Sequence, residues 1–262
     1  MLLIRINGKN YDFELSKMKI IKSIVKKFLY SKGWHVLSRG AFGYDCMTDL
    51  KQLCSKQEMR TIIDVGANMG QSWEEFRQSF PDATIHCIEP ASEALIVLRD
   101  KVDGCRNTVV HDYALGGENG SQVLNVFSSQ ACNSLLRRSC SVGAAVPEHL
   151  FKENGTEVIK IKTLESFAEQ EGISSIDLLK VDTQGYDLEV LKGAGQFLNN
   201  KIVKYVRVEL IWVNQYENQC DPLEVIGFLY ASGFSLIGFY DAARDADTKS
   251  IKWCDALFGP LV

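Results

Sequence analysis

Apolar residues recur along the chain in two patterns, short continuous runs and runs spaced three or four residues apart, which alternate from about residue 60 onward. Short apolar runs bounded by turn residues are typical of buried parallel strands, and the wider spacing is typical of the helices that cover them. This alternation predicts an α/β fold with a doubly wound, mostly parallel Rossmann-like sheet and helices on both faces. The expected strands are 61–65, 84–88, 108–111, 158–161, 176–181 and 202–211, and the expected helices are 71–80, 92–102, 164–171, 187–194 and 221–232.

Three segments depart from the regular alternation. Residues 121–127 alternate between apolar and polar positions, which predicts an additional strand. Residues 128–155 contain Ser, Gly, Ala and one Pro, and we expect a long irregular excursion, a feature that in compact domains is usually functional or disordered. Residues 234–240 and 252–258 are two apolar runs with no helix between them, which predicts a C-terminal antiparallel hairpin on the parallel sheet.

The N-terminal part of the chain has a different character. Residues 16–31 place apolar side chains at helical spacing with lysines between them, which predicts a basic amphipathic helix, and 46–56 predict a second short helix. Residues 1–55 carry ten Lys and Arg against four Asp and Glu. We therefore divide the chain into an N-terminal basic helical extension, 1–55, and one α/β domain, 56–262. The basic helix either caps the core with its lysines in water or contacts a membrane surface or an anionic glycan.

Composition narrows the class of protein. Hydrophobic residues at 46% and charged residues at 24% are typical of soluble globular chains, and a net charge of -4 gives no reason to expect a nucleic-acid partner. We find no apolar run long enough to span a membrane and no secretory leader, so the eight cysteines indicate thiols in a reducing, cytoplasmic setting. The four histidines lie far apart without CxxC or HExxH, so a zinc site has no sequence support, although distant residues can still assemble one.

The most informative motif is Asp64-Val-Gly66-Ala-Asn68-Met-Gly70, directly after the first core strand. Gly66 permits a tight turn and close approach of the backbone to a ligand, and Gly70 lets the next helix begin close beneath it. A dinucleotide-binding turn reads GxGxxG, whereas these glycines are four positions apart and a carboxylate precedes the first by two. That carboxylate favours a ligand with an ammonium group. A glycine-rich turn can also serve packing alone.

Two further acids follow the second and third core strands. Glu89, in Ile88-Glu89-Pro90, lies where an acid accepts both hydroxyls of a ribose, although a solvated loop residue would look the same. Asp112 is placed to accept from an adenine amino group, with Tyr113 beside it, although Asp after a strand is an ordinary turn residue. The predicted nucleoside-binding residues are thus Asp64, Gly66, Asn68, Gly70, Glu89, Asp112 and Tyr113.

Four segments together resemble the FkbM family of class I methyltransferases. They are DVGANMG at 64–70, IEP at 88–90, YALGG at 113–117 and LLKVDTQGYDLEVLKGA at 178–194, and their order and spacing agree from about residue 60 to 240. The resemblance implies S-adenosylmethionine as cofactor and O-methylation of a sugar or glycan hydroxyl or of a secondary metabolite. This family often has Glu where Gln184 stands here, which puts in doubt any role that needs a carboxylate at this position.

Charged residues interrupt two apolar strands near their carboxyl ends. Lys180 lies in the strand at 176–181, and Asp182 directly follows this strand on the same face. Glu209 interrupts the next apolar strand, at 202–211. Such charges must be paired when buried, and ligands bind at this edge of open α/β sheets. Removing a proton from an alkyl hydroxyl calls for a general base or a metal. Asp182 is our first candidate for the general base or a Mg²⁺ ligand, and Glu209 is the second. Lys180 would hold the Asp182 carboxylate in place. The alternative is that the three residues form a structural ion network.

Polar residues near the same edge are candidates for binding the acceptor. Asn133 and Ser134 lie in the excursion, where a similar Ser-containing stretch recurs in the FkbM family, and Tyr186 follows the fourth core strand. A surface turn is the alternative for the first two. The competing functions are a cofactor-binding but catalytically silent partner subunit and, less favoured by the glycine spacing, a nicotinamide oxidoreductase. A homo-oligomer is compatible with the sequence.

Overall fold

The computed structural model describes residues 2–6, 9–13, 23–25, 27–28, 30–32, 41–54, 58–139 and 147–261. The chain divides into two compact units, 1–41 and 42–262. In the first, β1 (Leu2–Ile6) and β2 (Lys9–Phe13) pair antiparallel, a hairpin that the sequence pattern did not lead us to expect. Within the predicted basic helix, residues 23–25, 27–28 and 30–31 are helical, and the rest of 16–31 lies outside the described residues.

Helix α2 (Cys46–Leu53) belongs to the second unit, although our division at residue 55 assigned it to the N-terminal extension. Its Cys46, Met47 and Leu50 side chains are buried in the same core as Trp73 and Phe76. The Asp45 carboxylate caps the helix by accepting from the Thr48 N–H. The apolar face of this short helix therefore completes the core of the α/β unit.

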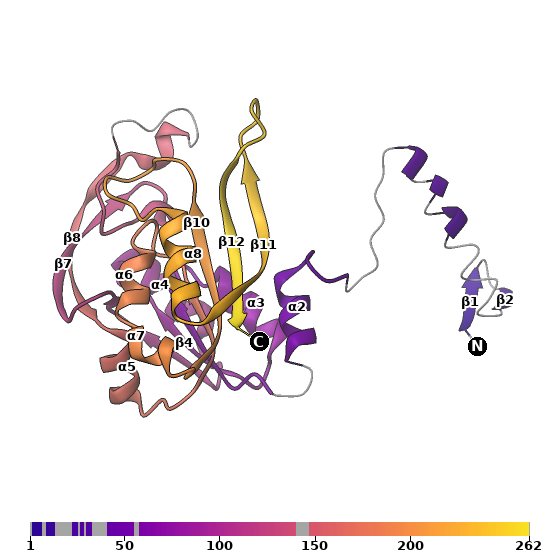
Figure 1. Cartoon of the computed structure of the whole chain (residues 1–262), viewed down its shortest axis with the longest axis horizontal. Coiled ribbons are helices and arrows are strands. Elements are labelled where there is room, and N and C mark those ends of the chain that lie inside the picture. Colours follow the sequence, from indigo (N-terminus) through magenta and orange to yellow (C-terminus); the bar gives the residue numbers. More distant parts are fainter. Residues whose placement is uncertain are drawn as a thin grey trace. The chain divides into compact units, whose positions relative to one another are not determined.

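A seven-stranded sheet with the order β11-β12-β10-β9-β3-β4-β5 forms the centre of the second unit (Figure 1). Five strands from β10 to β5 run parallel, and β12 pairs antiparallel with both of its neighbours. The predicted mostly parallel sheet and C-terminal hairpin are therefore confirmed. The strands are β3 (Thr61–Val65), β4 (Thr84–Ile88), β5 (Thr108–His111), β9 (Ile176–Val181), β10 (Val203–Ile211), β11 (Phe234–Arg244) and β12 (Ile251–Pro260).

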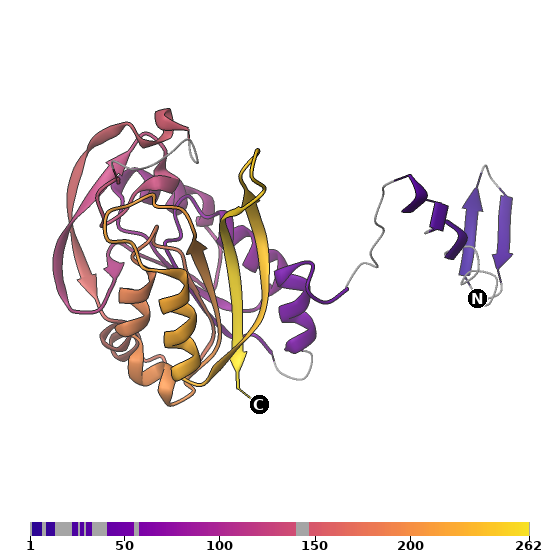
Figure 2. The same ribbon diagram turned by 45° about the horizontal axis from the view of Figure 1, so that its top comes forward.

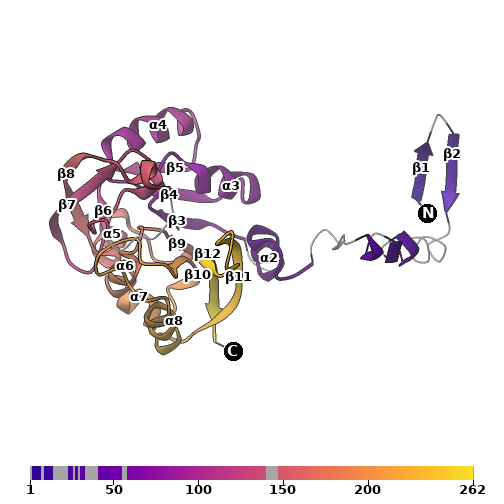
Figure 3. The same cartoon turned by 90° about the horizontal axis from the view of Figure 1, so that it is seen from above.

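Helices cover both faces of this sheet, as the view from above shows (Figure 3). Helices α2, α3 and α4 bury apolar residues against one face, and α5, α6 and α8 do so against the other. Pro222 follows the cap Asp221 at the start of α8, as predicted. The helices are α3 (Gln71–Ser79), α4 (Ser92–Val102), α5 (Leu164–Glu171), α6 (Asp187–Lys192), α7 (Gly195–Asn199) and α8 (Pro222–Ala231).

A second, three-stranded sheet lies along one flank of the unit and carries the excursion (Figures 1 and 2). Its strands are β6 (Ala114–Leu115), β7 (Gly120–Phe127) and β8 (Glu153–Lys162), and β7 pairs antiparallel with β8. Between them the described residues form two short 3-10 helices, η1 (Gln130–Cys132) and η2 (Glu148–Phe151). The Asn125 amide donates to the carbonyls of Ser134 and Leu136, which fastens the start of the excursion to β7.

Candidate active site

The glycine-rich turn after β3 brings the backbones of two neighbouring strands into close contact. Gly66 has φ +75°, and a Cβ added there would lie 1.9 Å from the carbonyl oxygen of Asp182. Only glycine fits this approach, so the turn is constrained by the end of β9 as well as by any ligand. Asn68 is also left-handed, with φ +48°, and Gly70, with φ +79°, caps the start of α3.

Glu89 at the end of β4 points back at this turn. Its side chain is buried, and its two oxygens accept from the backbone N–H groups of Asn68 and Ala91, each at 2.8 Å. Burial raises the pKa of Glu89 to about 7, although these hydrogen bonds oppose the rise. Each oxygen retains a second lone pair, so the ionised group is able to accept from a diol.

A buried ammonium group links the turn to β9. Lys180 Nζ lies 3.1 Å from Asp64 Oδ1 and 3.4 Å from Asp182 Oδ2, and it donates to the Gly66 carbonyl at 2.9 Å. Asp64 is fully buried and accepts from Ser72 Oγ at 2.6 Å. Burial lowers the pKa of Lys180, but the two carboxylates outweigh it and hold the pKa above its ordinary value. The lysine is therefore charged and fixes the relative positions of β3 and β9.

Asp182 and Glu209 meet at the carboxyl ends of β9 and β10, with the Gln184 amide between them. Gln184 Nε2 donates to Asp182 Oδ1 at 2.9 Å and to Glu209 Oε2 at 2.8 Å. Burial and then the negative charge of Asp182 raise the pKa of Glu209 well above its ordinary value. Burial also opposes ionisation of Asp182, but Lys180 and these hydrogen bonds outweigh it and lower its pKa. A proton held by the pair therefore lies on Glu209 rather than on Asp182.

Tyr216 is a member of this network that the sequence did not reveal. Its hydroxyl lies 3.0 Å from Gln184 Oε1 and 2.9 Å from the Cys132 carbonyl, so one hydroxyl group links the excursion to the loop after β9. Gln184 itself has φ +55°. The contact orients the Gln184 amide with its NH₂ toward the two carboxylates. An aromatic residue a few positions after a strand gives no specific sequence signal for such a role.

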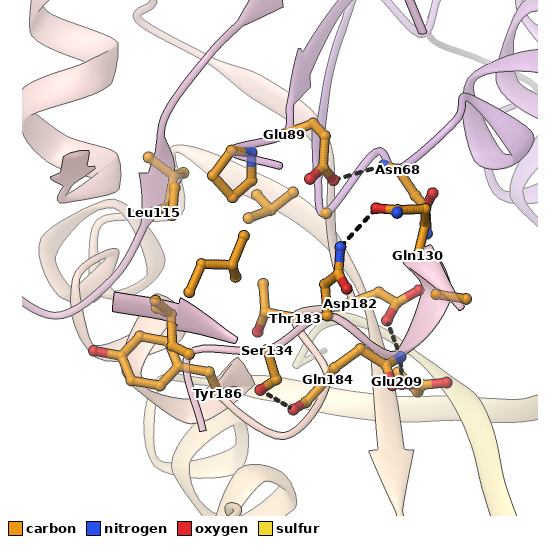
Figure 4. A pocket seen from close by; sticks show the side chains of 18 residues that line it. Asn68, Glu89, Leu115, Gln130, Ser134, Asp182, Thr183, Gln184, Tyr186 and Glu209 are labelled. Atoms are coloured by element: carbon orange, nitrogen blue, oxygen red, sulfur yellow. Dashed lines mark hydrogen bonds between the residues drawn. The ribbon is translucent and has the colours of Figure 1, made fainter. Parts of the chain in front are cut away.

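One cavity joins the turn, Glu89 and the carboxylate pair. Figure 4 shows Glu89 and Asn68 at one end and Gln184, Glu209 and Ser134 at the other. The lining of the cavity also includes the apolar side chains of Pro90, Leu115 and Leu124. Of the residues predicted from sequence, the cavity brings together Gly66, Asn68, Glu89, Asn133, Ser134, Asp182, Tyr186 and Glu209.

Four predicted cofactor residues do not line this cavity. Asp64 lies behind it as the partner of Lys180, and Gly70 faces α4, where a Cβ would meet Leu98. The Asp112 carboxylate is 66% exposed and pairs with Arg99 at 3.2 Å. Tyr113 is buried, and its hydroxyl lies 3.2 Å from His111 Nδ1. The structure therefore does not bring Asp112 and Tyr113 to the ends of the cavity formed by Glu89 and Asp182.

The predicted acceptor residues line the cavity, but most of their polar atoms already have partners. Asn133 accepts from the Phe127 N–H and donates to Gln130 Oε1. Ser134 Oγ donates to the Gln184 carbonyl and accepts from the Leu136 N–H. The Tyr186 hydroxyl accepts from Gln122 at 3.3 Å. Asn133 and Ser134 thus shape the wall of the cavity.

The residues at the carboxylate pair do not fit the Mg²⁺ site that we considered from sequence. Mg²⁺ needs oxygen ligands in near-octahedral order, whereas an amide NH₂ donor lies between Asp182 and Glu209 and uses an oxygen of each. Within the described part of the chain, no third His, Cys, Asp or Glu completes a ligand group with them. Proton transfer by the side chains themselves is the chemistry that this arrangement supports.

Comparison with known proteins assigns the chain to a family. It is 24% identical over 192 residues to the 2-O-methyltransferase NoeI of Sinorhizobium fredii, covering 71% of this chain and 76% of that protein. It is 27% identical over 142 residues to Methyltransferase 1 of Beauveria bassiana, covering 50% of this chain and 57% of that one. Among solved structures, precorrin-6Y C5,15-methyltransferase from Geobacter metallireducens matches with a TM-score of 0.44 and 11% identity, over 88% of this chain and 94% of the other. The family model described as "Methyltransferase FkbM domain" matches residues 64–236, so this chain belongs to the FkbM methyltransferase family.

Proposed function

We propose that this protein is an S-adenosylmethionine-dependent O-methyltransferase that acts on a hydroxyl of a sugar, glycan or secondary metabolite. The observation that carries the proposal is the cavity, which has a diol-accepting carboxylate, Glu89, at one end and a proton-accepting carboxylate, Asp182, at the other. The first end suits a nucleoside, and the second suits a hydroxyl acceptor. Family membership makes methyl transfer the reaction that joins them.

The cofactor end fits S-adenosylmethionine through the chemistry of its groups. The Glu89 carboxylate would accept from both ribose hydroxyls, and the apolar side chains of Pro90 and Leu115 would pack against the base. Gly66 lines this end of the cavity without a side chain, and Asn68 follows it in the left-handed turn. When bound, S-adenosylmethionine supplies a methyl group on a sulfonium, which is transferred by in-line displacement.

The acceptor end serves to position a hydroxyl and take its proton. An aliphatic hydroxyl has a pKa of roughly 15, so its proton must be removed as the new C–O bond forms. Asp182 faces the cavity, is ionised, and is held by Lys180 on one side and by Gln184 on the other. The raised pKa of Glu209 and the lowered pKa of Asp182 place any proton of the pair on Glu209 and leave the negative charge on Asp182. We assign Asp182 as the general base and Lys180 as its positioning residue.

Two facts favour an oxygen acceptor. The relative from S. fredii is described as a 2-O-methyltransferase, and the acceptor end exposes carboxylate, amide and hydroxyl oxygens that hydrogen-bond a polyhydroxyl compound.

Within the described residues, no helix has the length and apolar character needed to cross a bilayer. A cytoplasmic location and a homo-oligomeric state stay predictions.

The test measures cofactor binding and methyl transfer on the same protein. We expect S-adenosylhomocysteine, and not NADH, to raise the melting temperature, and we expect label from methyl-³H S-adenosylmethionine to enter methyl glycosides or hydroxylated metabolites. Asp182→Asn should lower turnover by about 10² with little change in S-adenosylhomocysteine affinity. Asp103→Asn, at an exposed position after α4, is the matched control.

Three results would each overturn a part of this proposal. Stabilisation by NADH alone would overturn the cofactor. Binding of S-adenosylhomocysteine without transfer to any hydroxyl compound would favour the catalytically silent subunit. Wild-type turnover in a folded Asp182→Asn variant would remove Asp182 from the mechanism.

A further inference from the structure

Two histidines far apart in the sequence face each other beneath helix α5. His86 lies in β4 and His111 ends β5, and their register places both on one face of the sheet. His86 Nδ1 and His111 Nε2 are 3.1 Å apart, and both residues are buried. Phe167 of α5 packs edge-on against both rings. Glu171, the exposed last residue of α5, brings its carboxylate to the pair, so that one ligand atom from each of the three lies within 4.8 Å of the others.

The spacing of the two nitrogens matches a shared metal ion. A Zn–N bond is about 2.0–2.1 Å, so an ion bonded to both nitrogens at their 3.1 Å separation would subtend an angle of about 100°, close to tetrahedral. The Glu171 carboxylate supplies a third ligand, and water would complete four-coordination.

A neighbouring hydroxyl is compatible with the required tautomer of His111. The Tyr113 hydroxyl lies 3.2 Å from His111 Nδ1. When Nδ1–H donates to this oxygen, the proton is on Nδ1 and Nε2 offers its lone pair toward His86. Metal-bound histidines are commonly held in this way by a partner on the second ring nitrogen.

We propose that His86, His111 and Glu171 form a binding site for a divalent transition metal, with Zn²⁺ as the best match. Two imidazoles and one carboxylate suit Zn²⁺ and Co²⁺, whereas Mg²⁺ and Ca²⁺ prefer oxygen ligands alone. Bound metal would tie the last turn of α5 to β4 and β5 and stabilise the folded chain. None of the three residues lines the methyl-transfer cavity, so this site is independent of the proposed function.

The test titrates the full chain, freed of metal by a chelator and then dialysed, with ZnCl₂ in a calorimeter. We expect one site, a higher melting temperature with Zn²⁺, and the visible absorption of four-coordinate Co²⁺ when CoCl₂ replaces it. His111→Ala should weaken Zn²⁺ binding about 100-fold or more, because removal of a ligand exceeds the 10- to 100-fold loss usual for an outer partner. Glu171→Gln, at the end of α5 and outside the core, keeps a neutral amide oxygen as a weaker ligand and should weaken it about 10-fold. His149→Ala, at an exposed histidine of η2, should bind as the wild type does.

The alternative is a single proton shared between the two imidazoles with no metal. In that case the wild type shows no Zn²⁺ site, and the proposal is overturned. Zn²⁺ binding of wild-type strength in both folded Glu171→Gln and His111→Ala would place the metal elsewhere and overturn it as well. Should His111→Ala fail to fold, the Glu171→Gln affinity and the Co²⁺ spectrum decide.

Discussion

The Glu89→Gln substitution measures how the buried Glu89 carboxyl group beside the glycine-rich turn changes the free energy of unfolding with pH. The pKa of Glu89 is raised from 4.5 to about 7, chiefly by burial. The folded chain therefore binds this proton more tightly than the unfolded chain, and the resulting stability is present at low pH and lost as pH rises through about 7. One pKa unit corresponds to about 1.36 kcal/mol, so between about pH 5 and pH 8 the loss amounts to about 2.5 kcal/mol.

Glutamine has no proton to lose in this range, so the variant lacks that contribution to the pH dependence. Its single amide oxygen can accept from only one of the Asn68 and Ala91 N–H groups, a loss of about 1 kcal/mol that is the same at every pH. We therefore expect urea unfolding free energies to fall between pH 5 and pH 8 by about 2.5 kcal/mol more in the wild type than in Glu89→Gln. Glu169→Gln, at an exposed position of α5, is the control and should follow the wild type.

Cofactor affinity provides the second measurement. Under the proposed function the ionised carboxylate would accept from the ribose and the protonated one would do so less well, so S-adenosylhomocysteine should bind the wild type more tightly as pH rises from about 6 to about 8. Glu89→Gln should bind more weakly by about 1 to 3 kcal/mol at the higher pH and lack this rise. Parallel pH curves of stability for the wild type and the variant would show that Glu89 does not titrate as a buried group, and the reasoning would fail.

Two further predictions concern the turn and the carboxylate pair. Gly66→Ala should destabilise the fold by about 3 kcal/mol or more in thermal or urea unfolding, because its Cβ would meet the Asp182 carbonyl at 1.9 Å. Gly104→Ala has a similar φ of +69° with nothing within 4 Å, so it should lose only about 1 kcal/mol, and equal losses would contradict the contact. Burial and the charge of Asp182 raise the pKa of Glu209, so its ionisation adds negative charge beside the base at a higher pH than for an ordinary carboxyl group, and kcat/KM in the wild type should increase with that ionisation. Glu209→Gln should lack that increase, and a pH profile unchanged by the substitution would count against the shared proton.

The sequence predicted the central sheet well because its strands are short, apolar and bounded by turn residues. The bounds of β3, β4, β5 and β9 agree with the predicted 61–65, 84–88, 108–111 and 176–181. Strands β3, β4 and β9 are almost entirely buried, so burial dictates their hydrophobic pattern, whereas β5 at the edge of the sheet is buried only in part.

The hydrophobic pattern of the sequence did not predict the bounds of elements whose positions do not depend on side-chain burial. Residues 153–157 extend β8 well before the predicted 158–161, although they read Glu-Asn-Gly-Thr-Glu, because pairing with β7 supplies their hydrogen bonds while most of their side chains stay exposed. The predicted helix 187–194 ends at Lys192 and a separate α7 follows. A Cβ at Gly193 would lie 2.0 Å from the Gly116 carbonyl, so this position is set by a close backbone approach from a distant segment.

The same distinction holds for the candidate site. Glu89, Asp182 and Glu209 were found because each follows or ends a core strand at the edge where ligands bind. Asp112 occupies the corresponding place after β5, but that strand is at the edge of the sheet and its carboxylate turns to solvent and Arg99. Contacts between side chains from distant loops, such as Tyr216 with Gln184, depend on orientations that spacing along the chain does not encode.

The position of β12 has a consequence for how the chain is made. It is the last strand in sequence, yet it lies between β10 and β11, and Glu209 of β10 is opposite its Asp255. During synthesis, β10 and β11 therefore each keep an unpaired backbone edge until residues 251–260, which form β12, have left the ribosome. Synthesis adds about 5 to 20 residues per second, so this interval is normally short. A ribosome that stalls before β12 is made leaves the edges of β10 and β11 unpaired and able to pair with another chain. Nascent chains arrested there should depend on chaperones and lack the strand that pairs with β10 at Glu209.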